Sequence, residues 1–164
     1  MSYQLSQDAK DHIDAWTQKF PTDKQRSAII ASLQFLQHEN HGYINEDQVK
    51  TLATYLDIPV IQIWEVATFY SMFQTKPVGK TCIAVCTNIS CMLRGSDQIL
   101  SHIEKRLGIK VGESTQDGKF FLKKEEECLA ACCGAPMLMV DHDYHENLDT
   151  EKVDQILDSL GAKI

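Results

Sequence analysis

The sequence predicts an α+β protein, with a helical bundle over residues 1–76 followed by an α/β domain over residues 77–164. Apolar residues in the first half recur every three or four positions, which is the period of an amphipathic helix. Lys76-Pro77-Val78-Gly79-Lys80 has the composition of a linker, and short β-rich runs alternate with helical spacing after it. A chain of 164 residues has room for two small domains of this kind.

Four helices are expected in the first half, each beginning near a residue that favours a helix start. These residues are Ser6, Asp23, Asn45 and Pro59. Pro21 ends the first helix, and Asn45 with Gln48 resembles a capping box. The apolar positions predicted to face the bundle core are Ala9, Ile13, Trp16, Phe20, Ile29, Leu33, Leu36, Val49, Leu52, Leu56, Ile63, Val66, Tyr70 and Phe73. The fourth helix is expected to reach Phe73, and its aromatic side chains predict core packing with one part facing a partner chain.

The second half predicts the order strand, helix, strand, strand, strand, helix. The expected strands span 81–86, 119–123, 137–140 and 144–147, and the expected helices span 92–107 and 151–160. Since strands and helices share this half, it should form a layered domain of its own.

Composition excludes several classes of protein. With 43% hydrophobic residues and four prolines, the chain should bury a core. A net charge of −7 argues against nucleic-acid binding, and no apolar run approaches the ~20 residues needed to span a bilayer. The first residues lack the basic and apolar regions of a signal peptide. The six cysteines are therefore expected in a reducing compartment, as metal ligands or core residues rather than disulfides.

Cys86, Cys91, Cys128 and Cys132 form C-x4-C followed at long range by C-x3-C. Four thiolates from two distant loops can hold a binuclear iron–sulfur cluster, so the spacing favours electron transfer. Zinc knuckles usually close on C-x2-C but tolerate longer spacers, so a zinc site stays an alternative. Redox-active or incidental thiols are a further alternative.

A four-thiolate cluster is anionic and needs backbone N–H donors around it. Cys91 is predicted where the first strand gives way to a helix beginning near Met92, whose N-terminus would favour negative charge. Arg94 could offset the charge or lie solvated at the surface. Residues 128–136 are mostly small, which lets the backbone approach the sulfides closely.

Two further cysteines are not predicted to be ligands. Cys82 and Cys86 share one face of a strand about 13 Å apart, too far for one compact cluster. Cys82 is therefore expected to be a buried small apolar residue. Cys133 is adjacent to Cys132, and the residues alone favour Cys132 only moderately as the ligand. The acidic run at 125–127 is expected to be a solvated face that could lower the reduction potential.

Two segments carry a resemblance to a known family. Residues 85–95 read VCTNISCMLRG and residues 127–137 read ECLAACCGAPM, while Ile58-Pro59 and EVATFYSMF at 65–73 precede them. These motifs closely resemble the small [2Fe–2S] subunit of the NADH-oxidising module of respiratory complex I, the family of the E-type subunit of NADH-quinone oxidoreductase. The similarity runs from about Leu5 to the C-terminus.

The resemblance implies a thioredoxin-like cluster domain after a helical bundle. It carries the ligand role for one [2Fe–2S] cluster onto Cys86, Cys91, Cys128 and Cys132. It also implies a partner flavoprotein subunit that holds FMN and oxidises NADH, other peripheral-arm subunits of complex I, and no direct membrane insertion. The expected location is cytoplasmic, peripheral to the inner membrane in a bacterial respiratory complex. Ala130 departs from the glycine usual in the family.

The same fold could instead be the small diaphorase subunit of an NAD-linked hydrogenase or formate dehydrogenase. A zinc-stapled binding module is the alternative from a different class. A thiol–disulfide enzyme is disfavoured because the sequence has no C-x-x-C.

Overall fold

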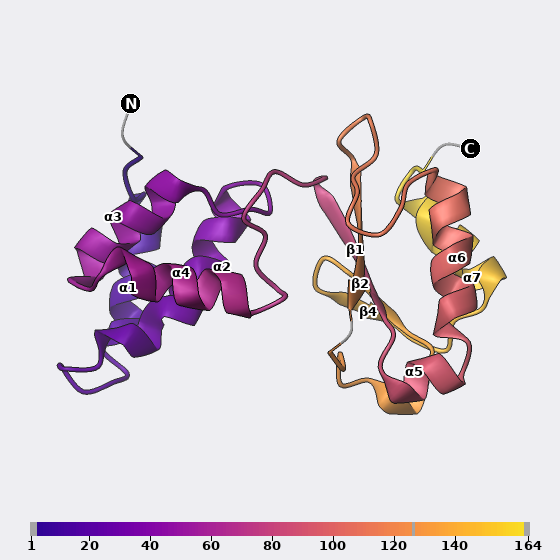
Figure 1. Cartoon of the computed structure of the whole chain (residues 1–164), viewed down its shortest axis with the longest axis horizontal. Helices are drawn as coiled ribbons and strands as arrows, with labels where there is room; N and C mark the ends of the chain where they lie inside the picture. The colour runs from indigo at the N-terminus through magenta and orange to yellow at the C-terminus, as the bar shows by residue number, and fades with distance from the viewer. Residues whose placement is uncertain (1–2, 126, 163–164) are drawn as a thin grey trace. The chain divides into compact units, whose positions relative to one another are not determined.

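The computed structural model describes residues 3–125 and 127–162. They form two compact units, Met1–Pro77 and Val78–Ile164, which are described separately below (Figure 1). The first unit is helical and the second combines a mixed sheet with helices, which confirms the α+β class.

The first unit packs its helices around one apolar core. Its elements are α1 (Gln7–Thr17), η1 (Gln25–Ala28), α2 (Ile29–Glu39), α3 (Glu46–Leu56) and α4 (Val60–Phe69). Ser6 caps α1 by accepting a hydrogen bond from Ala9 N. Asn45 and Gln48 form the expected capping box at the start of α3, a feature that stabilises a helix by about 1 kcal/mol. The largest fully buried side chains of this unit are Ile13, Ile29, Leu33, Leu36, Ile44, Leu52 and Ile63.

Two predicted helix boundaries in this unit were wrong. Asp23 does not cap the second helix, because a 3-10 turn at Gln25–Ala28 precedes α2 and Ala28 is the cap residue of α2. The fourth helix ends at Phe69, since Tyr70 adopts an extended conformation. Phe73 still joins the core from the segment beyond the helix, with 6% of its surface exposed.

The second unit contains a mixed four-stranded sheet among its described residues, in the order β2-β1-β3-β4. The strands are β1 (Thr81–Cys86), β2 (Phe120–Glu125), β3 (Leu138–Val140) and β4 (Asp143–His145). β2 runs parallel to the central strand β1, while β3 and β4 pair antiparallel. The order therefore places the ends of β1 and β2 next to each other.

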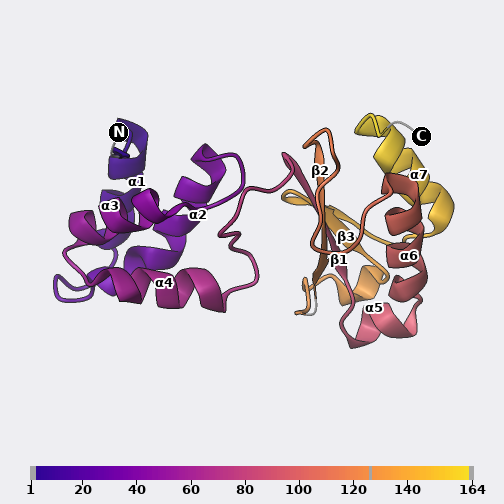
Figure 2. The same ribbon diagram turned by 45° about the horizontal axis from the view of Figure 1, so that its top comes forward.

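The predicted helix at 92–107 is two helices, α5 (Ile89–Leu93) and α6 (Ser96–Leu107). Gly95 separates them with φ 89°, a left-handed conformation that interrupts a helix and suits glycine. Cys91 consequently lies inside α5 rather than in front of a helix that starts at Met92. Figure 2 shows α5 at one end of the sheet, beyond the end of β1.

Helices α6 and α7 (Thr150–Ser159) cover one face of the sheet (Figure 1). Ile83, Val85 and Leu122 of that face pack in one cluster with Ile103 and Val153 from the helices. Because side chains alternate along a strand, Cys82, Ala84 and Cys86 lie on the opposite face. Across residues 3–125 and 127–162, no helix has the length and apolar character needed to cross a bilayer.

Candidate metal centre

The four cysteines of the motif meet at one end of the sheet. Cys86 is the last residue of β1, and Cys91 follows on α5. Cys128 lies three positions beyond the end of β2, and Cys132 begins a short 3-10 turn, Cys132–Gly134. Because β1 and β2 run parallel and in register, the loops that leave them emerge side by side. The pairing of β1 with β2 thus brings together two cysteine pairs that are distant from each other in sequence.

The cysteines form two pairs with different environments. Sγ of Cys128 lies 3.2 Å from Sγ of Cys132, and both residues are exposed. Cys86 and Cys91 are buried, and they pack with Ala135 and Met137 in a small apolar cluster. All six cysteines lie within the described residues and are free thiols. One pair is therefore shielded by the protein, and the other faces outward.

The thiols influence one another's protonation. The pKa of Cys91 is raised to about 11, first by burial and then by its hydrogen bond with Cys86. The pKa of Cys128 is lowered, because Cys132 and the backbone N–H of Ala130 donate to its sulfur and a hydrogen bond with Cys86 adds to this effect. The pKa of its partner Cys132 is raised for the matching reason. Cys86 therefore interacts with a cysteine of each pair.

The loop between Cys128 and Cys132 turns at Ala130, whose φ is 63°. In this conformation the Ala130 N–H points at the Cys128 sulfur, 3.3 Å away. The left-handed region costs an L-residue about 1–2 kcal/mol, and glycine avoids this cost. Ala130, where the resembled family usually has glycine, therefore has a backbone conformation that glycine adopts at lower cost.

We predict that Ala130→Gly stabilises the metal-free protein by about 0.5 kcal/mol, because relief of the backbone cost exceeds the added entropy of the unfolded chain. Ala131 is the matched control, since its φ is −112° and it gains no such relief. Ala131→Gly is expected to destabilise by about 0.5–1 kcal/mol. Urea unfolding of both variants measures the difference, and a loss of stability in both would contradict the prediction.

Side-chain hydrogen bonds from Arg94 and Thr87 help to join the segments that carry the cysteines. Arg94, at the end of α5, donates from Nη1 to the carbonyl oxygen of Ala135 at 3.2 Å. Thr87 donates from both its backbone N and its Oγ1 to the carbonyl oxygen of Glu125, at 2.8 and 3.1 Å. Arg94 thus links α5 to the segment that follows Cys132, and it also brings a positive charge near the site.

The two remaining cysteines occupy different places. Cys82 begins the sheet face that ends at Cys86, is half-buried, and has a pKa raised to about 11, mainly by burial. Its backbone N donates to Oδ1 of Asp141, just beyond the end of β3, at 2.8 Å. Cys133 is exposed in the 3-10 turn beside Cys132. Neither thiol is needed to complete the two pairs.

The prediction of a solvated acidic face at 125–127 was wrong for Glu125. This residue is only 5% exposed, and its Oε2 lies 2.5 Å from Nζ of Lys123. Glu127 is exposed as expected, and Glu126 lies outside the described residues. The pairing of β2 with the central strand buries the first of the three acids.

The donor set suits a binuclear cluster. Among residues 3–125 and 127–162, no group of three or more Cys, His, Asp or Glu side chains is arranged to hold a metal ion. A [2Fe–2S] cluster has two iron atoms, and two thiolate pairs supply the four protein ligands that it needs. Four free thiols, of which one pair is buried, fit such a cluster.

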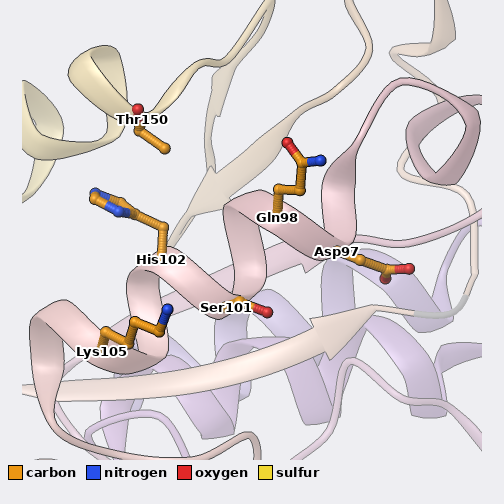
Figure 3. Close-up of a pocket in the computed structure, with 6 residues that line it drawn as sticks. All are labelled: Asp97, Gln98, Ser101, His102, Lys105 and Thr150. Carbon is orange, nitrogen blue, oxygen red and sulfur yellow. The ribbon is translucent and has the colours of Figure 1, made fainter.

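A pocket of about 440 Å³ lies elsewhere, along α6 and near the start of α7 (Figure 3). Asp97, Gln98, Ser101, His102, Lys105 and Thr150 line it. Nε2 of His102 lies 2.9 Å from Oδ1 of Asp154, so the histidine side chain is already engaged between the two helices. None of the four motif cysteines lines this pocket, and it is separate from the candidate centre.

A family model described as thioredoxin-like [2Fe–2S] ferredoxin matches residues 13–161. The chain belongs to this thioredoxin-like [2Fe–2S] ferredoxin family. The family implies an iron–sulfur cluster, and both the resemblance found in the motifs and the predicted thioredoxin-like fold are confirmed.

Relatives of this ferredoxin-family chain include proteins named as the E-type subunit of NADH-quinone oxidoreductase. That of Rickettsia bellii is 45% identical over 87% of this chain and 84% of its own length. A Rhizobium meliloti protein of the same name, numbered as the second, is 40% identical over 93% of this chain and 89% of its own length. The similarity therefore includes both units.

The fold is also found in an NAD+-reducing [NiFe]-hydrogenase. Its air-oxidized crystal structure aligns with a TM-score of 0.67 over 80% of this chain, at 23% sequence identity. The alignment covers only 23% of the hydrogenase chain, so this ferredoxin-family protein corresponds to about a quarter of that longer polypeptide. At this level of identity the likeness concerns the fold alone.

Proposed function

We propose that this protein is the electron-transfer subunit of a bacterial NADH:quinone oxidoreductase, respiratory complex I, and that it binds one [2Fe–2S] cluster through Cys86, Cys91, Cys128 and Cys132. The meeting of two thiol pairs at the ends of paired strands carries this proposal. The relatives named as subunits of NADH-quinone oxidoreductase support the complex to which it is assigned.

The bound cluster would supply a site that accepts and releases a single electron. The chain's own residues have three tasks around it. Burial of Cys86 and Cys91 keeps water from one side, and the Ala130 N–H donates toward a ligand sulfur. Arg94 holds the two loops together. Such N–H donors and the degree of solvent exposure are what set the potential of an iron–sulfur site.

The partner in this proposal is the flavoprotein subunit that holds FMN and oxidises NADH, with other subunits of the peripheral arm nearby. An electron partner must approach the outward side of the site, where Cys128 and Cys132 are exposed. Helix α5, which carries Cys91, exposes Ile89 and Leu93, at 66% and 76%. Exposed apolar side chains of this kind are favourable at a protein interface. The proposed location is the cytoplasmic side of the inner membrane, held there through the complex.

Anaerobic purification tests the cofactor. We expect a brown protein with about two irons and two acid-labile sulfides per chain, and a one-electron paramagnetic signal after reduction. Colourless protein that holds one zinc ion would end the proposal and favour the zinc-stapled module.

Affinity capture of the tagged chain from its own organism tests the partner. Recovery of an FMN-containing NADH dehydrogenase subunit with quinone-reducing activity is the expected result. The second candidate is a diaphorase subunit of an NAD-linked hydrogenase or formate dehydrogenase, since the same fold occurs in an NAD+-reducing hydrogenase. Recovery of hydrogenase or formate dehydrogenase subunits would replace the first proposal with the second.

A further inference from the structure

A buried pair of opposite charges lies beside the cysteine site. Nζ of Lys123 is 2.5 Å from Oε2 of Glu125, and their side chains are only 15% and 7% exposed. The ion pair of Lys24 with Asp23, by contrast, is exposed at the surface, where solvent screens it. Burial makes the charges of Lys123 and Glu125 act over a longer range, because less water lies between them and their neighbours.

The strand register brings this pair to the face that carries Cys86. In the parallel pairing of β1 with β2, Glu125 is the direct partner of Cys86 and Lys123 is the partner of Ala84. Paired residues on neighbouring strands project to the same face, and the strands are about 4.8 Å apart. Glu125 is thus placed next to a proposed ligand, with Lys123 one step further along the same face.

Backbone contacts keep Glu125 in this place. Thr87 directly follows Cys86, and both its N and its Oγ1 donate to the Glu125 carbonyl oxygen. Three residues after Glu125 the chain reaches Cys128. Glu125 therefore joins the segment that leads to Cys128 to the strand that ends at Cys86.

We propose that Lys123 and Glu125 act in opposite directions on the potential at which a cluster bound at the four-cysteine site accepts an electron, so that each charge offsets the other. This inference rests on the proposed function, because it needs the cluster to be bound. The electron that a bound cluster would accept adds one negative charge to a site that already carries four thiolate ligands. The Glu125 carboxylate opposes that addition, and the Lys123 ammonium favours it, so the effects of the intact pair nearly cancel.

Removing one charge at a time should move the midpoint potential in opposite directions. Glu125→Gln removes a negative charge next to Cys86, and we expect the ratio of reduced to oxidised protein at a fixed potential to rise at least tenfold, or about 59 mV for one electron. Lys123→Met removes a positive charge on the same face, and we expect a fall of similar size.

The double variant Lys123→Met with Glu125→Gln removes both charges and should return the potential close to that of the unchanged protein. Glu127→Gln is the matched control, because Glu127 is exposed and directly precedes Cys128. Solvent screening should leave its effect well below that of Glu125→Gln. Dithionite supplies the electrons in an anaerobic titration of the whole purified chain, followed by the paramagnetic signal.

The outcomes separate this inference from the proposed function. If the unchanged protein binds two irons but both single variants shift the potential in the same direction, or not at all, the pair is only structural and the inference is wrong. A double variant that keeps the shift of either single variant would also overturn it. If Glu125→Gln does not take up iron, Lys123→Met tests the inference by itself: a lower midpoint potential supports it, and an unchanged or higher one overturns it. Unchanged protein without iron would instead contradict the proposed function.

Discussion

Cys86→Ala is expected to remove nearly all iron and acid-labile sulfide from the protein, whereas Cys82→Ala is expected to retain both. Cys86 is buried at the end of β1 and interacts with a cysteine of each pair. Cys82 lies on the same face at the far end of that strand, about 13 Å away along the chain. Loss of one of four ligands leaves an iron atom with an open coordination position, which destabilises the whole cluster.

Iron and sulfide content of anaerobically purified variants, together with their visible absorption, gives the measurement. Cys133→Ala and Cys132→Ala extend the comparison to adjacent residues of the same turn. We expect Cys132→Ala to lose the cluster and Cys133→Ala to keep it. Equal losses from Cys82→Ala and Cys86→Ala would show that the ligand assignment is wrong. So would a Cys133→Ala variant that loses iron while Cys132→Ala keeps it.

The sequence predicted correctly the helix starts that depend on capping residues only a few positions away. The Ser6 cap and the Asn45–Gln48 capping box lie within three residues of the groups that they bind, so spacing alone identifies them. The strand at Thr81–Cys86 followed from its β-rich composition. Gly95 divides the predicted helix in two. The break was not predicted, because the apolar spacing on both sides of Gly95 is helical.

The end of the fourth helix depends on a contact distant in sequence. Gln37 on α2 donates from Nε2 to the carbonyl oxygen of Met72 at 3.0 Å and accepts from Gln74 N at 2.7 Å. These bonds hold the segment after Tyr70, which turns at Ser71 and Met72 instead of continuing the helix. No glycine or proline marks the boundary, so the local pattern continued the helix to Phe73.

The same distinction holds for the candidate site. The cysteine spacing identified both pairs, because each pair is local in sequence. The burial of Glu125 was not predictable from its acidic neighbours, since it results from pairing with Cys86 in β1. The ion pair with Lys123 follows from alternation along β2, but only once the residue is known to be inside the protein.

Gly79→Ala is expected to destabilise the second unit by about 3 kcal/mol, at the upper end for a side chain forced into filled space. A Cβ at Gly79 would overlap the carbonyl carbon and oxygen of Phe120 and would lie 2.8 Å from the backbone N of Phe121. These are backbone atoms of β2, which cannot turn aside as a flexible side chain could. The parallel pairing of β1 and β2 begins here, where Thr81 N donates to the carbonyl oxygen of Lys119 at 2.8 Å.

Gly118→Ala is the matched control for Gly79→Ala. Gly118 has φ 67° but open space around the position of a Cβ, so the substitution adds only backbone strain of about 1 kcal/mol. Urea unfolding followed by circular dichroism compares the two variants. Equal losses would mean that β2 moves to accommodate the methyl group. A larger loss from Gly79→Ala would show that the close approach of β2 makes glycine necessary before β1.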